Sequence, residues 1–383
     1  MFRRHFLKLL CCTPAIHLVS GKTAAAQQCL REACATAGAE VAHIRSQYSF
    51  DPERTYFNTG GLGPAPKAVL ETVIRTMQQL QFDGQHGHHL IEDARPAVAA
   101  FVGCRPEELA FTRNATEGNA TIASGLALQP GDEVILDSHA HQGGSLAWLA
   151  RQKSEDIVVK VFEPSAESAR ENIARIEELI TPRTRVVQVS HVTAPTGIRM
   201  PVQEIAQLAQ RNGLWFHIDG AQSLGMFPFR FADLGCDSYA ACCHKWVGGP
   251  HGTGILAIKH DKLDQVTPTE AGAYVEAEWD LPGTLEYVDS ARRFEAGTRD
   301  AATIVAIVEA MNFLSDITMQ RVEQHGLTLA NFLRQQLRTL PQVQVLSPTA
   351  PELCSSMVTF QVEGKSCDEV FRTLMKKTSA AAR

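Results

Sequence analysis

Two short stretches decide the fold: residues 214–222 read LWFHIDGAQ, and residues 242–250 read CCHKWVGGP. In each, an apolar run leads to polar residues, so Asp219 and Lys245 are expected at the ends of two consecutive buried strands. Around them, short β-branched runs alternate with helical segments along the chain. This alternation predicts an α/β fold with mostly parallel strands joined by helices.

The expected strands cover six runs: 134–136, 157–162, 186–190, 214–219, 238–242 and 254–258. Helices are expected over 67–80, 168–180 and 366–377, the first with Val69, Val73, Ile74 and Met77 on one apolar face. We expect a large sheet domain over 60–305, preceded by an N-terminal segment over 27–59. A small C-terminal α/β domain is expected over 306–383.

Composition excludes several classes of protein. The chain has 383 residues, of which 44% are hydrophobic and 20% charged, and this excludes intrinsic disorder. The formal net charge of -6 provides no basic surface for nucleic acid. Ten cysteines are too few for a disulfide scaffold, and no Cys-x-x-Cys spacing occurs. We read His86, His88 and His89 as loop histidines at a pocket mouth and predict no metal site.

The N-terminus predicts export. Arg3-Arg4-His5-Phe6-Leu7-Lys8 resembles a twin-arginine signal, an apolar stretch follows it, and Ala24-Ala25-Ala26 offers small residues for cleavage. No later apolar run reaches the ~20 residues that cross a bilayer. Residues 1–26 are therefore predicted to be a signal peptide that engages the twin-arginine export machinery. The protein is expected in the periplasm, without stable membrane insertion after cleavage.

Asp219 and Lys245 together favour pyridoxal 5'-phosphate (PLP). A lysine amine can form an imine with the PLP aldehyde, and a carboxylate can keep the pyridine nitrogen protonated as an electron sink. Taken separately, Asp219 could cap a turn and Lys245 could be a solvated surface charge. Their placement on two consecutive strand ends favours the cofactor.

Residues 112–119, TRNATEGN, are the candidate phosphate loop. They stand between a short apolar run and a helical stretch, where backbone amides and the Thr116 hydroxyl could hold one phosphate. A simple helix N-cap is the alternative. The glycine spacings typical of dinucleotide and nucleoside triphosphate sites are absent.

At these residues the chain resembles the class V (fold type I) aminotransferase family, and most closely its isopenicillin N epimerase-like branch. Six segments match in the family's order: 56–64, 112–119, 191–197, 219–222, 244–246 and 294–300. The resemblance extends from about residue 48 to about residue 340. With its export signal, the chain is also similar to periplasmic pyoverdine-tailoring PLP enzymes.

The resemblance implies roles for single residues. Lys245 would hold the cofactor and move protons at the substrate carbon, and Asp219 would pair with the pyridine nitrogen. Gln222 would face the ring hydroxyl, and His139 would stack over the ring, although a structural histidine is the alternative there. The phosphate would be bound by Ala115, Thr116, His244 and, from the other subunit of a homodimer, Thr298. Asn58, Gly60 and Arg299 would face the substrate.

Three departures from the family bear on function. Cys242 stands near the phosphate where many relatives have serine. Ala194 replaces an asparagine of cysteine desulfurases, and no cysteine matches their persulfide-forming loop, which disfavours that activity. After residues 356–360 and one helix, no counterpart of the family's C-terminal carboxylate-binding arginine follows. The C-terminal domain is therefore expected to be shortened, with an unpaired strand near 357–360.

These residues predict an exported, homodimeric PLP enzyme with shared active sites. It would act on an amino acid or an amino-acid side group through a carbanion, as an isopenicillin N epimerase-like enzyme. Tailoring of a side chain in a secreted peptide or siderophore and carbon–sulfur lysis stay open as alternatives. A PLP-binding protein without turnover is the alternative from another class.

Overall fold

A computed structural model describes residues 38, 40–50, 55–378 and 380–381. The predicted signal peptide and most of the 27–59 segment lie outside the described residues. Contacts divide the chain into two compact units, residues 1–51 with 66–68 and residues 52–65 with 69–383. In the first unit, Tyr48 pairs with Pro66 through an isolated bridge, and the Lys67 amide donates to Gln47 O. The predicted boundary near residue 305 stays a prediction.

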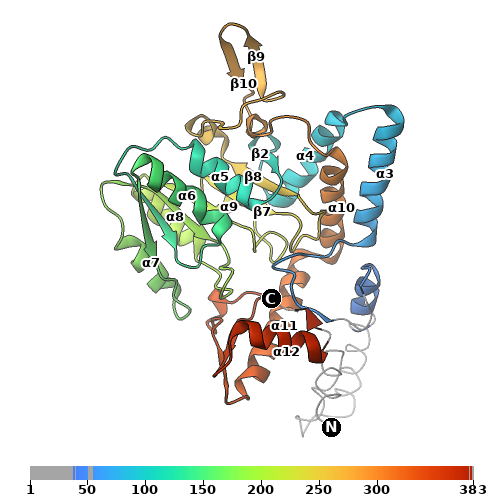
Figure 1. The fold of residues 1–383 in the computed structure, drawn as a ribbon, viewed down its shortest axis with the longest axis vertical. Helices are drawn as coiled ribbons and strands as arrows, with labels where there is room; N and C mark the ends of the chain where they lie inside the picture. The colour runs from blue at the N-terminus through green and yellow to red at the C-terminus, as the bar shows by residue number, and fades with distance from the viewer. Residues whose placement is uncertain (1–37, 39, 51–54, 379, 382–383) are drawn as a thin grey trace. The chain divides into compact units, whose positions relative to one another are not determined.

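A mixed, mostly parallel sheet of seven strands forms the centre of the second unit (Figure 1). Its order is β2-β8-β7-β6-β5-β3-β4, and the five strands from β7 to β4 run parallel. Strand β8 is antiparallel to both of its neighbours. The bounds are β2 Leu109–Thr112, β3 Glu133–Asp137, β4 Val158–Phe162, β5 Thr184–Ser190, β6 Trp215–Asp219, β7 Ser238–Cys242 and β8 Gly254–Ile258. The predicted α/β class with a mixed, mostly parallel sheet is confirmed.

The central strands are buried on both faces, and their alternation separates two apolar clusters. In β7 and β8, Tyr239 and Ile255 belong to one cluster, whereas Ala240 and Leu256 belong to the other. The first cluster includes residues of the helices α4 (His88–Val102), α8 (Val202–Arg211) and α10 (Ala301–Ile317). The second includes residues of α5 (Ala115–Gly125) and α6 (Gln142–Glu155). Near-continuous apolar runs are what a sheet covered by helices requires.

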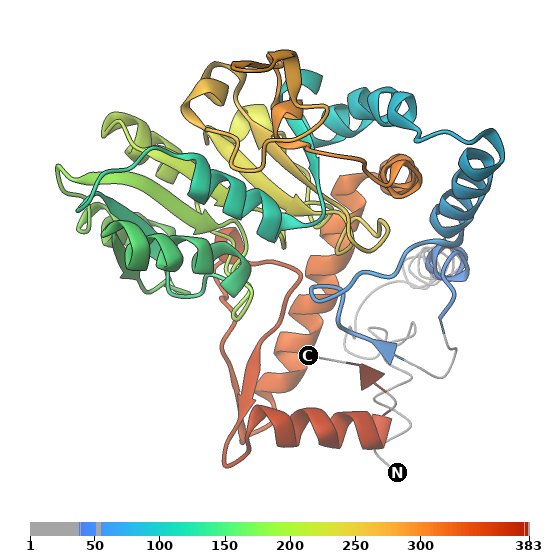
Figure 2. The same cartoon turned by 45° about the horizontal axis from the view of Figure 1, so that its top comes forward.

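The helices carry the labels of Figure 1. Their bounds are α3 Lys67–Asp83, α4 His88–Val102, α5 Ala115–Gly125, α6 Gln142–Glu155, α7 Ala169–Glu177, α8 Val202–Arg211, α9 Phe231–Leu234, α10 Ala301–Ile317, α11 Met319–Arg338 and α12 Cys367–Thr378. Four 3₁₀ turns are η2 Pro106–Glu108, η3 His260–Gln265, η4 Ala291–Phe294 and η5 Pro351–Leu353. Figure 2 shows α10 and α11, in orange, running from beside the sheet toward α12, in red.

Three smaller pairs of strands lie outside the main sheet. Strands β9 (Glu276–Asp280) and β10 (Thr284–Tyr287) form the hairpin that projects at the top of Figure 1. Strand β1 (Thr55–Tyr56) is parallel to β13 (Ala380–Ala381). Strand β11 (Val343–Val345) is antiparallel to β12 (Phe360–Val362). The prediction of an unpaired strand near 357–360 is therefore wrong, because β12 begins at Phe360 and pairs with β11.

Two further expectations need correction. In α3, Val69 is buried and Val73 packs against the core as predicted, but Ile74 is 58% exposed and Met77 is 39% exposed. Thr72 and Leu80 complete the buried face. His88 and His89 are the first residues of α4 and not loop residues, although they do line a pocket.

Among the described residues, no single helix is long and apolar enough to cross a membrane. The pair α10 and α11, bent by 75°, reaches that length and composition only when both are taken together.

Candidate active site

Four strands end in polar or thiol side chains at one edge of the sheet. Strands β3, β5, β6 and β7 end at Asp137, Ser190, Asp219 and Cys242. The register pairs Ser190 with Asp219, so these ends lie side by side. The carboxyl edge of parallel strands is where open α/β sheets bind ligands, and the predicted residues gather here.

Asp219 is a buried carboxylate held by two hydrogen bonds. Its Oδ1 accepts from the Ala221 amide at 3.0 Å, and its Oδ2 accepts from Asn119 Nδ2 at 3.0 Å. The residue is 6% exposed, and within the described part of the chain no basic side chain forms an ion pair with it. A buried carboxylate that lacks a cation is suited to a positively charged ligand atom.

A buried network fixes the orientation of Asn119. His217 Nε2 lies 2.8 Å from Asn119 Oδ1, and His217 Nδ1 lies 2.8 Å from Ser238 Oγ. Because Asn119 Oδ1 can only accept, Nε2 carries the proton and Ser238 donates to Nδ1. Burial lowers the pKa of His217 to about 3, so the imidazole is neutral. Neither Asn119 nor His217 was predicted from the sequence as a site residue.

Lys245 lies in the turn after β7 and is partly buried. Its Nζ has no hydrogen bond or ion pair with any residue that the structure describes. The turn is packed against Gly63, whose amide donates to His244 O at 2.9 Å. A Cβ on Gly63 would lie 1.6 Å from Lys245 O, so only glycine allows this approach.

Cys242 interacts with three of the predicted cofactor residues: Ala115, Asp219 and Lys245. Its Sγ accepts a hydrogen bond from the Ala115 amide at 3.4 Å. Burial raises the pKa of the thiol, the Lys245 charge opposes this increase, and the Asp219 charge adds to it. Cys242 therefore lies within electrostatic reach of Lys245 and Asp219 and in contact with Ala115.

The N-terminus of α5 forms the candidate phosphate site. Asn114 caps the helix by accepting from the Glu117 amide at 3.0 Å, so the N-cap and the phosphate hypotheses apply to the same turn. Thr116 is exposed, and a Cβ on Gly143 of α6 would lie 2.3 Å from its Oγ1. His244 donates from Nδ1 to Thr253 O at 3.1 Å, and burial lowers the pKa of His244. Its Nε2 stays available to a ligand.

Glycines of α6 allow the second helix to approach Asp219. A Cβ on Gly144 would lie 2.8 Å from Asp219 Oδ2. Gln188 Nε2 donates to Gly144 O at 2.7 Å, and Trp148 Nε1 donates to Gln188 Oε1 at 2.7 Å. These hydrogen bonds fix the start of α6 beside the Asp219 carboxylate, and they were not predicted from the sequence.

His139 follows β3 and is held by both ring nitrogens. Nε2 lies 3.0 Å from Glu163 Oε1, and Nδ1 lies 3.0 Å from Thr196 Oγ1. His141, the neighbour, accepts from the Gly143 amide and caps α6. Asp137 accepts from the Ser190 amide through Oδ2, but its buried Oδ1 has no partner among the described residues. Burial raises the pKa of Asp137 to about 6, helped by the nearby Asp219 charge.

Gln222 connects the N-terminal segment 56–64 to the lysine turn. Its Nε2 donates to Gly60 O at 2.9 Å, and its Oε1 accepts from Trp246 Nε1 at 2.8 Å. Asn58 lies in the same segment, where its backbone oxygen accepts from the Gly61 and Leu62 amides. The predicted residues Asn58, Gly60 and Gln222 are thus brought to the Lys245 turn.

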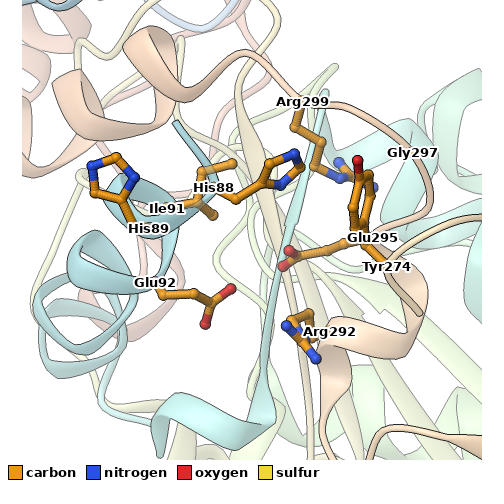
Figure 3. Close-up of a pocket in the computed structure, with 9 residues that line it drawn as sticks. All are labelled: His88, His89, Ile91, Glu92, Tyr274, Arg292, Glu295, Gly297 and Arg299. Carbon is orange, nitrogen blue, oxygen red and sulfur yellow. The ribbon is translucent and has the colours of Figure 1, made fainter. Parts of the chain in front are cut away.

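Thr298 and Arg299 form no contact with this group among the interactions that the structure describes. Thr298 is exposed, and its predicted contact with a second subunit stays a prediction. Arg299 donates from Nη1 to Phe111 O at 3.0 Å and from Nη2 to Phe294 O at 3.3 Å. It lines a different cavity, to which neither Lys245 nor Asp219 contributes (Figure 3).

Comparison with known proteins decides the family. A sequence profile described as Aminotransferase class-V matches residues 65–383. The chain belongs to the class V aminotransferases. Isopenicillin N epimerase from Amycolatopsis lactamdurans is 29% identical over 335 residues, which cover 84% of each chain. A probable cysteine desulfurase from Mycolicibacterium paratuberculosis is 31% identical over 287 residues, covering 74% of this chain and 41% of that protein.

Solved structures agree with this class V assignment. A mutant of C-DES with glycine covalently linked to the PLP cofactor is 27% identical and covers 88% of this chain and 91% of that one, with a TM-score of 0.80. An apo cysteine desulfurase from Thermococcus onnurineus, at 23% identity, shares the fold with a TM-score of 0.79 over 88% of this chain and 86% of that one. The chain is therefore a PLP-dependent enzyme of the class V family.

The residues of this class V site fit PLP. The buried Asp219 carboxylate has no cation of its own, so a protonated pyridine nitrogen would compensate its charge. Lys245 presents an amine without an acceptor, and the start of α5 offers amides and a hydroxyl for a phosphate. Asp219, Lys245 and the start of α5 all interact with Cys242.

Proposed function

We propose that this class V enzyme removes and returns a proton at the α-carbon of an amino-acid-like substrate, as in epimerisation. The observation that supports the proposal best is the Lys245 amine, which has no hydrogen-bond partner in the described chain and follows the strand β7, whose neighbour β6 ends at the buried Asp219. Bound PLP supplies the electron sink that stabilises negative charge at the substrate carbon.

Different residues of this chain would bind the cofactor and transfer protons. Lys245 anchors the cofactor and then serves as the base and acid at the substrate carbon. Asp219 holds the proton on the pyridine nitrogen, and Asn119 fixes the carboxylate for that contact. Ala115, Thr116 and His244 bind the phosphate. His139, whose two ring nitrogens are held by Glu163 and Thr196, would pack over the ring.

The epimerase relatives support this choice of reaction. Two isopenicillin N epimerases, from Amycolatopsis lactamdurans and Streptomyces clavuligerus, align with more than four fifths of this chain and of their own length. The substrate stays at the level of an amino acid or an amino-acid side group, including one carried by a secreted peptide or siderophore.

Carbon–sulfur lysis is the second candidate. It is supported by the likeness to the cystine C-S lyase C-DES, at 27% identity and a TM-score of 0.78. A persulfide-forming desulfurase is less well supported, because Cys236, Cys242, Cys243 and Cys354 are buried. The one exposed cysteine in the described part of the chain, Cys367, lies on α12.

Export and dimerisation complete the proposal. The motif Arg3-Arg4-x-Phe6-Leu7-Lys8 supports transport of the folded protein to the periplasm. The exposed Thr298, next to Gly297 at φ 78°, supports a homodimer in which Thr298 reaches the phosphate of the other subunit. Full PLP affinity in a Thr298→Val variant would contradict the shared site.

Exchange of the substrate α-proton tests the proposed reaction. The PLP-loaded protein is incubated in D₂O with L- and D-amino acids and with L-cystine, and deuterium uptake and pyruvate are measured. We expect deuterium at the α-carbon with at least one amino acid and no exchange in Lys245→Ala, whereas the surface variant Lys153→Ala should exchange normally. Pyruvate, ammonia and cysteine persulfide from cystine, with no deuterium at the α-carbon of the recovered amino acids, would favour the lyase. No product and no exchange at all would favour a PLP-binding protein without turnover.

A further inference from the structure

His139 joins three segments at the carboxyl edge of the sheet. It follows β3, and its Nε2 lies 3.0 Å from Oε1 of Glu163, which follows β4. Its Nδ1 lies 3.0 Å from Oγ1 of Thr196, in the turn that follows β5. The His139 side chain is only 17% exposed, so these contacts with the protein decide where the ring proton lies.

The turn that carries Thr196 is itself fixed. The Gly197 amide donates to Thr193 O at 2.8 Å, and Ser355 Oγ donates to Gly197 O at 2.7 Å. A Cβ on Gly197, whose φ is 69°, would lie 2.8 Å from the Met357 Cβ, so the turn is packed closely against the C-terminal segment. Thr196 therefore approaches the imidazole from a backbone that has little freedom to shift.

The hydrogen bonds around His139 run in one direction. A carboxylate can only accept, so Nε2 carries the proton that faces Glu163. Nδ1 of this neutral tautomer is an acceptor, and Thr196 donates to it. Thr196 Oγ1 lies 2.8 Å from Thr193 Oγ1, which accepts from the Ile198 amide at 2.9 Å. Thr193 in turn donates to Thr196, and every proton in this hydrogen-bond chain has an acceptor.

The other two proton arrangements leave a group unsatisfied. With the proton on Nδ1, the lone pair of Nε2 would face the Glu163 carboxylate. With protons on both nitrogens, Thr196 would donate to Thr193, whose own proton would then lack an acceptor among the described residues, although Thr193 is fully buried. The Glu163 side chain is 66% exposed, and an ion pair with an exposed carboxylate contributes less than a buried hydroxyl without an acceptor costs. The contacts therefore favour the tautomer with the proton on Nε2.

We propose that Glu163 and Thr196 are positioning residues that hold His139 in the tautomer with the proton on Nε2. Both ring nitrogens are then used by the protein, so His139 provides a fixed surface beside the cofactor and leaves proton transfer at the substrate carbon to Lys245. The place of His139 over the ring rests on the proposed function, whereas its tautomer does not. The resemblance to the family gives no role to Glu163 or Thr196.

Nitrogen-15 NMR of the PLP-loaded protein, labelled at histidine, tests the tautomer, and a His139→Gln variant identifies the signal. We expect a protonated Nε2 and an unprotonated Nδ1 in the wild type and in Thr196→Ser, and a mixture of tautomers in Thr196→Val. Deuterium exchange of the substrate α-proton should be at least about threefold slower in Thr196→Val, because one hydrogen bond to the imidazole is lost, and should be restored in Thr196→Ser. Thr328→Val, which removes an exposed hydroxyl that donates to Gln324 O on α11, is the matched control.

Other outcomes would overturn the proposal. A wild-type His139 with its proton on Nδ1, or with protons on both nitrogens, would exclude the assigned tautomer. An unchanged tautomer or an unchanged exchange rate in Thr196→Val would exclude the positioning role. If Thr196→Val does not fold, Glu163→Leu at the exposed end of the hydrogen-bond chain takes its place, with the same expected results. If no amino acid exchanges its α-proton, the proposed reaction is wrong, whereas the NMR signal still decides the tautomer.

Discussion

Asn119 donates a hydrogen bond from Nδ2 to Asp219 Oδ2 at 3.0 Å, and its carbonyl oxygen accepts from the neutral His217 at 2.8 Å. The carboxylate that we propose to pair with the pyridine nitrogen is thereby fixed from α5, a helix whose first turn forms the candidate phosphate site. In this proposal one helix would position both ends of the cofactor.

Asn119→Ala should weaken PLP binding at least about tenfold and lower the free energy of unfolding by about 1–3 kcal/mol, because Asp219 and His217 each lose a buried partner. Cofactor affinity is measured by titrating PLP into the apoprotein, and stability by chemical denaturation. Asn212→Ala, which removes a side-chain bond to Leu208 O at the end of α8, serves as the control. Normal PLP affinity in Asn119→Ala would show that Asn119 does not position Asp219 for the cofactor.

Gly63→Ala should disrupt the lysine turn, because the added Cβ would lie 1.6 Å from Lys245 O. Overpacking of this kind costs about 1–3 kcal/mol, and here the displaced backbone carries the PLP-binding lysine. We expect a lower melting temperature and a weaker visible cofactor band. Gly283→Ala is the matched control, since no atom lies within 4 Å of its added Cβ. If Gly63→Ala and Gly283→Ala have the same melting temperature and cofactor band, the lysine turn can shift without loss of stability or of PLP binding.

Asp137 should make stability depend on pH between about 4 and 6. Burial raises its pKa from 3.8 to about 6, so the folded state holds the proton more tightly than the unfolded state. Protonated Asp137 stabilises the folded state fully below pH 4. This stabilisation is lost as the pH rises through 6, which lowers the free energy of unfolding by up to about 3 kcal/mol. The free energy of unfolding of the wild type, minus that of Asp137→Asn, should therefore fall across this range. A constant difference would show that Asp137 is ionised throughout.

Replacing Arg3 and Arg4 by lysine should leave the precursor in the cytoplasm, because the twin-arginine pair is the feature that predicts export. Cell fractionation with an antibody against the protein measures the distribution. The single change Lys22→Arg, outside the motif, is the control. A normal periplasmic level in the double variant would show that the twin-arginine prediction is wrong.

The sequence predicted the central sheet well, because runs such as Ser238–Cys242 and Gly254–Ile258 are continuously apolar and buried on both faces. It missed the β9–β10 hairpin, although EAEWD and TLEY alternate between polar and apolar residues, and almost all of these residues are exposed in the structure. In α3 it also placed Ile74 and Met77 on the buried face, where they are exposed. Amphipathic spacing defines a face, whereas the neighbouring helices decide whether that face is covered.

The candidate site was predictable where chemistry requires a rare combination of residues. A lysine and a carboxylate on consecutive strand ends have few other uses, so Lys245 and Asp219 were found. Asn119 and His217 were not, because a buried polar network joins residues 98 positions apart and leaves no local pattern. Arg299 was expected at the substrate, but its guanidinium is fixed by the carbonyls of Phe111 and Phe294, a long-range contact that no spacing indicates.

Borohydride reduction of the PLP-loaded protein, followed by mass spectrometry of its peptides, tests the central claim most directly. We expect the visible band to disappear and the reduced cofactor to be attached to the peptide that contains Lys245. The Lys245→Ala protein should carry no covalent cofactor, and Lys153→Ala should be labelled as the wild type. Reduced cofactor on a different lysine, or the same covalent band in Lys245→Ala, would contradict the assignment of this site.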